Sequence, residues 1–119
     1  MHIKIDLPDL NPILQSLERA ADLYESNQAE LMSLAMREAG KTYQDAIDEV
    51  REAVDFLRYY VNLAQKVIPN KREALGIFVC ISPWNFPLAI FTGQIAAALS
   101  AGNVVIAKPA ESTSLIAYR

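Results

Sequence analysis

The sequence predicts an α/β fold in which amphipathic helices precede a strand-helix-strand unit. Three helical stripes of apolar residues come before residue 69, and two short runs that are apolar on both faces follow it, separated by a helix without charge. The charged first part and the nearly charge-free second part predict a division into a helical segment, 1–68, and an incomplete α/β segment, 69–119.

Composition narrows the class of protein. The chain has 119 residues, 52% of them hydrophobic, and a formal charge of -3, which suits a small globular unit. The sequence has no stripe of basic residues that would favour binding to nucleic acid. No stretch reaches the roughly 20 apolar residues of a membrane span, and no signal-peptide run opens the chain. The single cysteine agrees with a reducing compartment, so we expect a cytoplasmic protein, and the sequence predicts no metal site.

The first two helices have recognisable ends. Asn11 followed by Pro12 predicts an N-cap and a first helical position, and apolar residues then recur every three or four positions. Asn27 with Glu30 predicts a capping pair for the second helix, and Gly40 predicts its left-handed stop. The expected inner residues are Leu14, Leu17, Ala21 and Tyr24 in the first helix, and Leu31, Leu34 and Ala35 in the second.

A third, longer helix follows Thr42, which is predicted to cap it together with Asp45. The opposite face of this helix carries charges that can pair with one another along a solvated surface. The helix is expected to break at 69–72. Its apolar stripe is Ile47, Val50, Val54, Leu57, Val61 and Ala64, and its charged face is Asp48, Arg51, Asp55 and Arg58.

The sequence of the second segment predicts a strand, a helix and a second strand. Residues 77–81 and 104–107 are apolar on both faces, as in parallel strands covered by helices on each side. Pro87 opens a helix that runs to about Ser100, and Gly102 stops it. The crossover is expected to be right-handed. Because this helix has no charge, it should be buried all round, and a further helix is expected to begin at Ser112 or Thr113.

Two strands and a wholly buried helix need more cover than three amphipathic helices give. We therefore expect the chain to be part of a larger protein, and to form oligomers or associate with the remainder of that protein.

Asn85 is the first candidate site residue. Pro83 and Pro87 bracket a stiff turn after the first strand, and ligands of open α/β sheets bind beyond the carboxyl ends of the strands. The Asn85 amide can donate there to a ligand or to a developing negative charge. The alternative is that Asn85 merely caps the following helix, and Trp84 can equally be a packing residue.

Lys108 and Glu111 follow the second strand at the same edge. The lysine can donate to a ribose hydroxyl or a phosphate, and the glutamate can accept from ribose hydroxyls. The alternative is a solvated ion pair. The four glycines, Gly40, Gly76, Gly93 and Gly102, form no Gly-x-Gly-x-x-Gly motif, so a standard Rossmann phosphate loop is absent.

Five motifs occur in an order that resembles the aldehyde dehydrogenase family. The sequences of 37–41, 49–60 and 80–82 are similar to one branch of this family, the pyrroline-5-carboxylate dehydrogenase half of bifunctional proline utilization proteins. The resemblance covers roughly 17–117. The motifs are Glu38-Ala39-Gly40-Lys41, Arg58-Tyr59-Tyr60, Ser82-Pro83-Trp84-Asn85-Phe86-Pro87, Ala101-Gly102-Asn103 and Lys108-Pro109-Ala110-Glu111.

The resemblance implies the first β-α-β unit of a Rossmann-like NAD-binding domain in an enzyme that oxidises glutamate semialdehyde to glutamate. It implies that Asn85 stabilises the oxyanion formed when a cysteine thiolate attacks the aldehyde. Lys108 and Glu111 would hold the adenosine ribose, and Glu111 would favour NAD over NADP. Backbone around Ile81, Ser82, Pro83 and Trp84 would line the cofactor cleft.

The resemblance also implies what this chain lacks. The family's catalytic cysteine, its general-base glutamate and its glycine-containing turn lie beyond the equivalent of Arg119. Cys80 precedes the oxyanion motif inside an apolar strand, where a thiol is normally inert. Ser112-Thr113-Ser114 replaces the family's Gln-Thr-Pro. We therefore expect these 119 residues alone to be an N-terminal fragment without activity.

Three other interpretations stay open. The chain can be a binding module that keeps a weak NAD half-site or assembles with the rest of an enzyme in trans. It can belong to a different semialdehyde dehydrogenase. It can also be a purely structural helical protein, in which case 77–81 and 104–107 would not pair as parallel strands.

Overall fold

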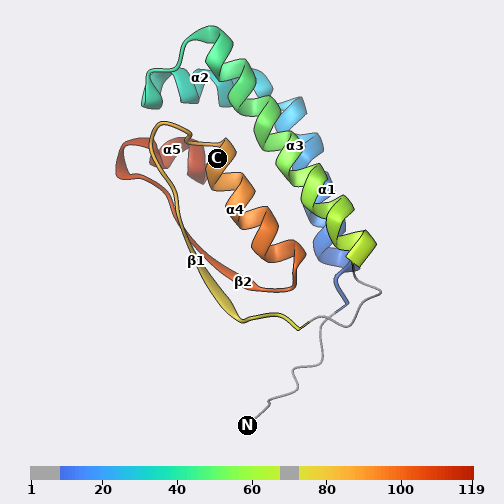
Figure 1. Cartoon of the computed structure of the whole chain (residues 1–119). Helices are drawn as coiled ribbons and strands as arrows, with labels where there is room; N and C mark the ends of the chain where they lie inside the picture. Colours follow the sequence, from blue (N-terminus) through green and yellow to red (C-terminus); the bar gives the residue numbers. More distant parts are fainter. Residues whose placement is uncertain (1–8, 68–72) are drawn as a thin grey trace.

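The computed structural model describes residues 9–67 and 73–119, which form three layers (Figure 1). Helices α1 and α3 lie side by side, α4 packs against α3, and a parallel sheet lies on the other side of α4. The predicted order of helices, strand, helix and strand is confirmed. The elements are α1 (Asn11–Ser26), α2 (Gln28–Ala39), α3 (Tyr43–Val67), β1 (Ile77–Ile81), α4 (Ala89–Ser100), β2 (Val104–Lys108), the short 3₁₀ helix η1 (Glu111–Thr113) and α5 (Ser114–Tyr118).

The helix ends depart from the predicted caps in two places. Leu10, not Asn11, is the N-cap of α1, and the Asn11 N–H donates to Asp9 Oδ1 at 3.0 Å. Asn27 stands at the N-cap of α2, but its side chain donates to the Leu23 carbonyl one turn back and caps nothing. A short amide can bond to the preceding turn as readily as to the next one. The Gly40 stop is confirmed by its φ of 64°.

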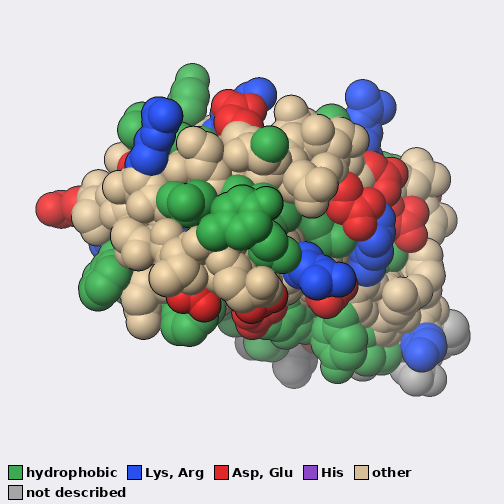
Figure 2. All heavy atoms as spheres, turned by 90° about the horizontal axis from the view of Figure 1, so that it is seen from above, with side chains coloured by type: hydrophobic (Ala, Val, Ile, Leu, Met, Phe, Trp, Pro, Cys, Tyr) green, Lys and Arg blue, Asp and Glu red, His purple; other side chains and the backbone are tan. Residues whose placement is uncertain are grey.

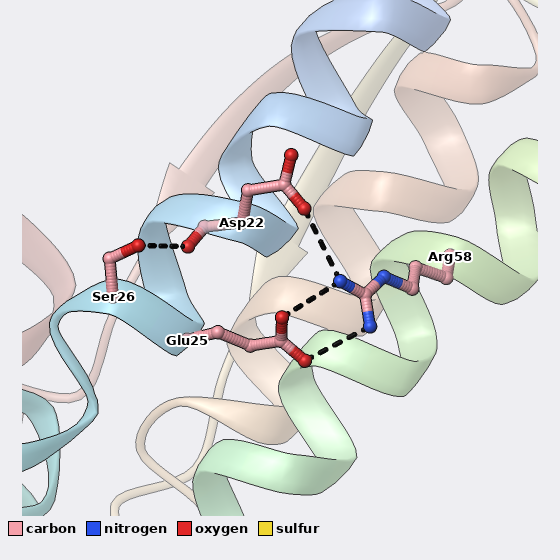
Figure 3. Close-up of polar contacts among 4 residues, drawn as sticks. All are labelled: Asp22, Glu25, Ser26 and Arg58. Carbon is pink, nitrogen blue, oxygen red and sulfur yellow. Dashed lines mark hydrogen bonds and ion pairs between the residues drawn. The ribbon is translucent and has the colours of Figure 1, made fainter.

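Helix α3 begins as predicted, because Thr42 Oγ1 accepts a hydrogen bond from the Asp45 N–H at 3.1 Å. Its inner stripe is buried apart from Ile47, which is half-buried. The charged face differs from the prediction. Arg58 does not pair along α3 but reaches across to α1, where it contacts Glu25 at 2.9 Å and Asp22 at 3.3 Å (Figure 3). The side-by-side packing of α1 and α3 puts these acids in reach.

The hydrophobic core draws on both predicted segments. One cluster joins α1 and α3 to Ala96 of α4, and a second joins α2 and α3 to Leu88 and Ile116. Tyr24 of α1 also meets Thr92 of α4, with 3.1 Å between the two hydroxyl oxygens. Burial raises the pKa of the Tyr24 phenol, and the bond to Thr92 partly opposes that rise. The predicted boundary and helix break fall in 68–72, outside the described residues, so the two-segment division stays a prediction.

No residue of helix α4 is exposed, but half of them are only half-buried, so the predicted burial on every side is confirmed only in part. It begins at Ala89, two residues after Pro87, which lies in the preceding turn. At Gly93 it comes so close to α3 that an added Cβ would lie 2.9 Å from Phe56 Cδ2. A residue without a side chain therefore sets the spacing of the two helices. Gly102, at φ 87°, follows the end of α4 as predicted.

The two strands pair in parallel with Ile77 opposite Val104 and Ile81 opposite Lys108. The prediction that helices cover both faces is wrong for the described residues. In β1 only Cys80 is buried, at 7% exposure, while Ile77, Val79 and Ile81 are more than 60% exposed. The reason is that α4 covers one face of the sheet and no other described element covers the second (Figure 1). The parallel pairing itself excludes a purely helical structural protein.

The last helix starts close to its predicted place. Residues 111–113 form one 3₁₀ turn and α5 follows from Ser114, with Thr113 at the N-cap but no side-chain cap bond. Across the described residues, no helix has the length and apolar character that crossing a membrane requires.

Candidate functional site

An open groove of about 710 Å³ lies at the carboxyl ends of the two strands. The groove brings together five of the six residues predicted to bind a cofactor, and the sixth, Ile81, is outside its lining. Asn85, the predicted catalytic residue, is also outside the lining. Its lining residues are Ser82, Pro83, Trp84, Lys108, Ala110, Glu111 and Ser112.

Ser82 is fixed at the base of this edge. Its N–H donates to the Lys108 carbonyl at 3.1 Å, which continues the parallel pairing one residue past β1. Its buried hydroxyl donates to Gln94 Oε1 at 3.3 Å, and the Gln94 amide donates in turn to the Ile81 carbonyl. Gln94 was not among the predicted site residues. It is the one long polar side chain of the uncharged helix, and that isolation is the sequence signal for it.

Lys108 and Glu111 are exposed at the groove, and they do not pair with each other. The Lys108 ammonium donates to the Pro109 carbonyl at 2.8 Å, and among the described residues no ion pair joins it to Glu111. The ion-pair alternative is therefore wrong. An ammonium donor and a carboxylate acceptor that face solvent in one groove match the hydroxyl pair of a ribose, which accepts from one and donates to the other.

Ile81 and Trp84 differ in their surroundings. The Ile81 side chain is 63% exposed and lines a different hollow, together with Cys80 and Gln94. The prediction for Ile81 concerns its backbone, and the backbone carbonyl accepts from the Gln94 amide. Trp84 is 57% exposed in the groove lining, so the described residues do not bury its ring.

Asn85 lies exposed in the turn between β1 and α4. It does not cap the helix. Leu88 is the N-cap of α4, and the N–H groups of Leu88 and Ala89 donate to the distant Glu49 of α3. The capping alternative is therefore wrong, which leaves the Asn85 amide accessible at this end of the molecule.

Glu49 is the site residue that sequence reasoning missed. Its carboxylate is 2% exposed, and Oε1 accepts from the Leu88 N–H at 2.9 Å and the Ala89 N–H at 2.8 Å. Oε2 lies 3.6 Å from the Lys41 ammonium, which sits 4.4 Å from the centre of the Phe86 ring. A signal did exist, because Glu49 stands beside Val50 and three residues after Ala46 on the inner face of its helix.

Glu38 plays a similar part for α5. Its carboxylate accepts from the Ile116 N–H at 2.7 Å and from the Leu115 N–H at 3.1 Å. Ser112 and Thr113 had been expected to start this helix, but a carboxylate from α2 satisfies its first N–H groups instead.

Cys80 is buried in β1, as predicted for an inert thiol. The described residues contain no group of three or more histidine, cysteine, aspartate or glutamate side chains that could hold a metal ion. Figure 2 looks onto the end of the molecule where the strands finish, and there exposed hydrophobic side chains gather between acidic and basic ones.

Comparison with known proteins finds one family match and relatives of related kinds. Residues 11–119 match the aldehyde dehydrogenase family. Over 102 residues the chain is 65% identical to the bifunctional protein PutA of Klebsiella aerogenes, covering 85% of this chain and 8% of that protein. It is 39% identical to 1-pyrroline-5-carboxylate dehydrogenase of Anoxybacillus flavithermus, covering 87% of this chain and 22% of the relative.

A solved structure extends the comparison to the fold. Crystals of 1-pyrroline-5-carboxylate dehydrogenase from Thermus with bound NAD contain a chain that is 36% identical, with a TM-score of 0.84 over 90% of this chain and 23% of that one. The predicted fold class is therefore confirmed down to the arrangement of its elements. The chain spans less than a quarter of the length of each of these relatives.

Proposed function

The chain belongs to the aldehyde dehydrogenase family, and on that premise we propose that its whole protein oxidises glutamate semialdehyde, the open form of pyrroline-5-carboxylate, to glutamate with NAD. The single observation that carries the proposal is the 65% identity to a bifunctional PutA, supported by relatives named 1-pyrroline-5-carboxylate dehydrogenase. These names do not favour the alternative of another semialdehyde dehydrogenase.

The groove at the carboxyl ends of β1 and β2 holds the adenosine end of NAD in this proposal. Lys108 donates to a ribose hydroxyl and Glu111 accepts from the neighbouring one. The Glu111 carboxylate repels a phosphate on the ribose, which favours NAD over NADP. Ile81, Ser82, Pro83 and Trp84 shape the cleft with backbone and ring surface. When bound, NAD supplies the acceptor for the hydride that the aldehyde loses.

Asn85 takes the catalytic role. Its amide donates to the carbonyl oxygen of the aldehyde, which becomes negative as a thiolate attacks the carbonyl carbon. Loss of one donor of this kind typically costs about 2.7 to 4 kcal/mol in the barrier. Cys80 is not that thiolate, because it is buried in β1 away from the turn that carries Asn85. These 119 residues alone therefore do not oxidise the aldehyde.

The helical segment serves as the platform of this arrangement, and residues 69–119 form part of the NAD-binding domain. The exposed strand residues Ile77, Val79 and Ile81 are the surface on which the remainder of the protein or another copy packs. The protein acts in the cytoplasm in this proposal.

The test compares three proteins: the full-length enzyme that contains this segment, its Asn85→Ala variant and the isolated 119 residues. NADH formation from glutamate semialdehyde is expected for the first, at a kcat lowered about 10²- to 10³-fold in the second, and absent in the third. A Glu111→Gln variant is expected to raise the KM for NAD and to improve the use of NADP. A full-length enzyme that forms no NADH from this aldehyde overturns the proposal.

A further inference from the structure

The turn that carries Asn85 is held at both of its ends and over its middle. At the strand end, the Ser82 N–H is bonded to the Lys108 carbonyl. At the helix end, Glu49 accepts from the N–H groups of Leu88, the N-cap residue, and of Ala89, the first residue of α4. Between them, the Lys41 ammonium lies over the Phe86 ring. Pro83 and Pro87 further restrict the backbone of the same turn.

The attachment at the helix end is unusual because it is both buried and remote in sequence. Glu49 is 39 residues before Leu88, and its carboxylate has almost no contact with solvent. Helix α4 offers no side chain of its own to cap its N-terminus. The two N–H donors are aimed at one carboxylate oxygen, and the helix dipole favours the negative charge there. Removal of this carboxylate leaves two buried donors without a partner.

Lys41 links this carboxylate to the turn itself. Its ammonium is 3.6 Å from Glu49 Oε2 and 4.4 Å from the Phe86 ring centre, so one cation touches both the cap and the residue next to Asn85. The position of Lys41 follows from Gly40, whose left-handed conformation ends α2 and turns the chain toward α3. In the motif Glu38 to Lys41, Gly40 therefore serves to place Lys41 beside Glu49 and Phe86.

The geometry points to Glu49, supported by Lys41, as the positioning residue that sets the place of the Asn85 amide. This inference rests on the proposed function of Asn85. Glu49 touches neither the reacting atoms nor the groove lining, and it acts through the Leu88 and Ala89 backbone. Catalytic donors lose effect when they move by about 1 Å, which can cost up to about 10²-fold in rate.

The test is a double-mutant cycle in the full-length enzyme, measured as kcat/KM for the aldehyde at saturating NAD. Glu49→Gln keeps an oxygen acceptor but loses the charge, and it is expected to lower kcat/KM about 10-fold or more. The dissociation constant of NAD is expected to stay unchanged, because the groove residues keep their own contacts. Glu52→Gln, the same change at an exposed position one turn along α3, is the matched control and is expected to have no effect.

The cycle is completed with Asn85→Ala. If Glu49 acts by placing Asn85, Glu49→Gln is expected to have no further effect once the Asn85 amide is gone. Losses that multiply in the double variant, or a Glu49→Gln enzyme as active as Glu52→Gln, overturn the inference while the wild-type activity still supports the proposed function. A wild-type enzyme without activity, or an Asn85→Ala enzyme with full activity, overturns the proposed function itself.

A second variant covers the case in which Glu49→Gln does not fold. Lys41→Gln leaves both backbone bonds of Glu49 in place and removes only the cation over Phe86. It is expected to lower kcat/KM in the wild-type background and to have no effect in the Asn85→Ala background. Equal losses in both backgrounds, or no loss in either, overturn the inference.

Discussion

Two glutamates join α3 to its neighbours, and they do so in different ways. Glu49 is buried and accepts from two backbone N–H groups at the N-terminus of α4, whereas Glu25 of α1 is exposed and pairs with the Arg58 side chain (Figure 3). The donors at Glu49 are fixed by a helix and shielded from water. The donors at Glu25 sit on a long, flexible side chain that water can replace. We therefore expect burial and fixed donors, more than the number of contacts, to decide how much each junction contributes to the free energy of unfolding.

The largest effect is expected for Glu49→Ala. It removes the acceptor of two buried N–H groups and leaves the Lys41 ammonium without its partner, so we expect a loss of about 3–5 kcal/mol in the free energy of unfolding. Urea unfolding of the 119 residues, followed by circular dichroism, measures it. Glu52→Ala is the control on the same helix. If both variants lose the same stability, the buried hydrogen bonds of Glu49 do not stabilise the fold as inferred.

The next effect is expected at the close approach of α3 and α4. A methyl group at position 93 would lie 2.9 Å from Phe56 Cδ2, so Gly93→Ala should cost about 1–3 kcal/mol. The same unfolding experiment measures it. Phe56→Leu narrows the obstructing ring, and the double variant should be less destabilised by the added methyl than the wild-type background is. Equal costs in both backgrounds would show that the ring is not the obstacle.

A smaller and more local effect is expected for Glu38→Ala. Its carboxylate lies at a less enclosed site than Glu49 and holds only the start of α5, so the cost should be about 0.5–1.5 kcal/mol. Hydrogen exchange of the Leu115 and Ile116 amides should become faster, while amides in the middle of α3 keep their protection. Unchanged exchange at both amides would contradict the assigned cap.

The smallest effect on stability is expected for Arg58→Ala, whose consequence should instead appear in a titration. The hydrogen bond from Arg58 holds the pKa of Glu25 below its usual value of 4.5. A lowered pKa in the folded state gives stability that is present above the usual pKa and is lost as the pH falls through the folded value. In Arg58→Ala the Glu25 pKa, followed by NMR, should rise toward its usual value.

Glu30 provides the control for that titration. Its hydrogen bond from Arg119 lowers its pKa independently of Arg58, so its titration should not change in the variant. A Glu25 pKa that stays low without Arg58 would assign the shift to another group.

Local signals determined much of the fold. The three-four stripes, the Thr42 cap and the Gly40 stop placed the helices, because these features act over a few residues and need no distant partner. The sequence alone also brought Lys108 and Glu111 to the groove beside Ser82, since the carboxyl ends of two parallel strands meet at one edge.

Only the tertiary structure decided which side chains cap the helix ends and which charged groups pair. Glu49 and Glu38 accept from backbone N–H groups that lie 39 and 77 residues further along the chain, and Arg58 pairs across helices instead of along its own. These contacts depend on how α3 packs on α1 and α4 and how α2 packs on α5, and no short-range pattern encodes that packing. The exposure of Ile77 and Val79 has the same origin, because an apolar strand is buried only where another layer covers it.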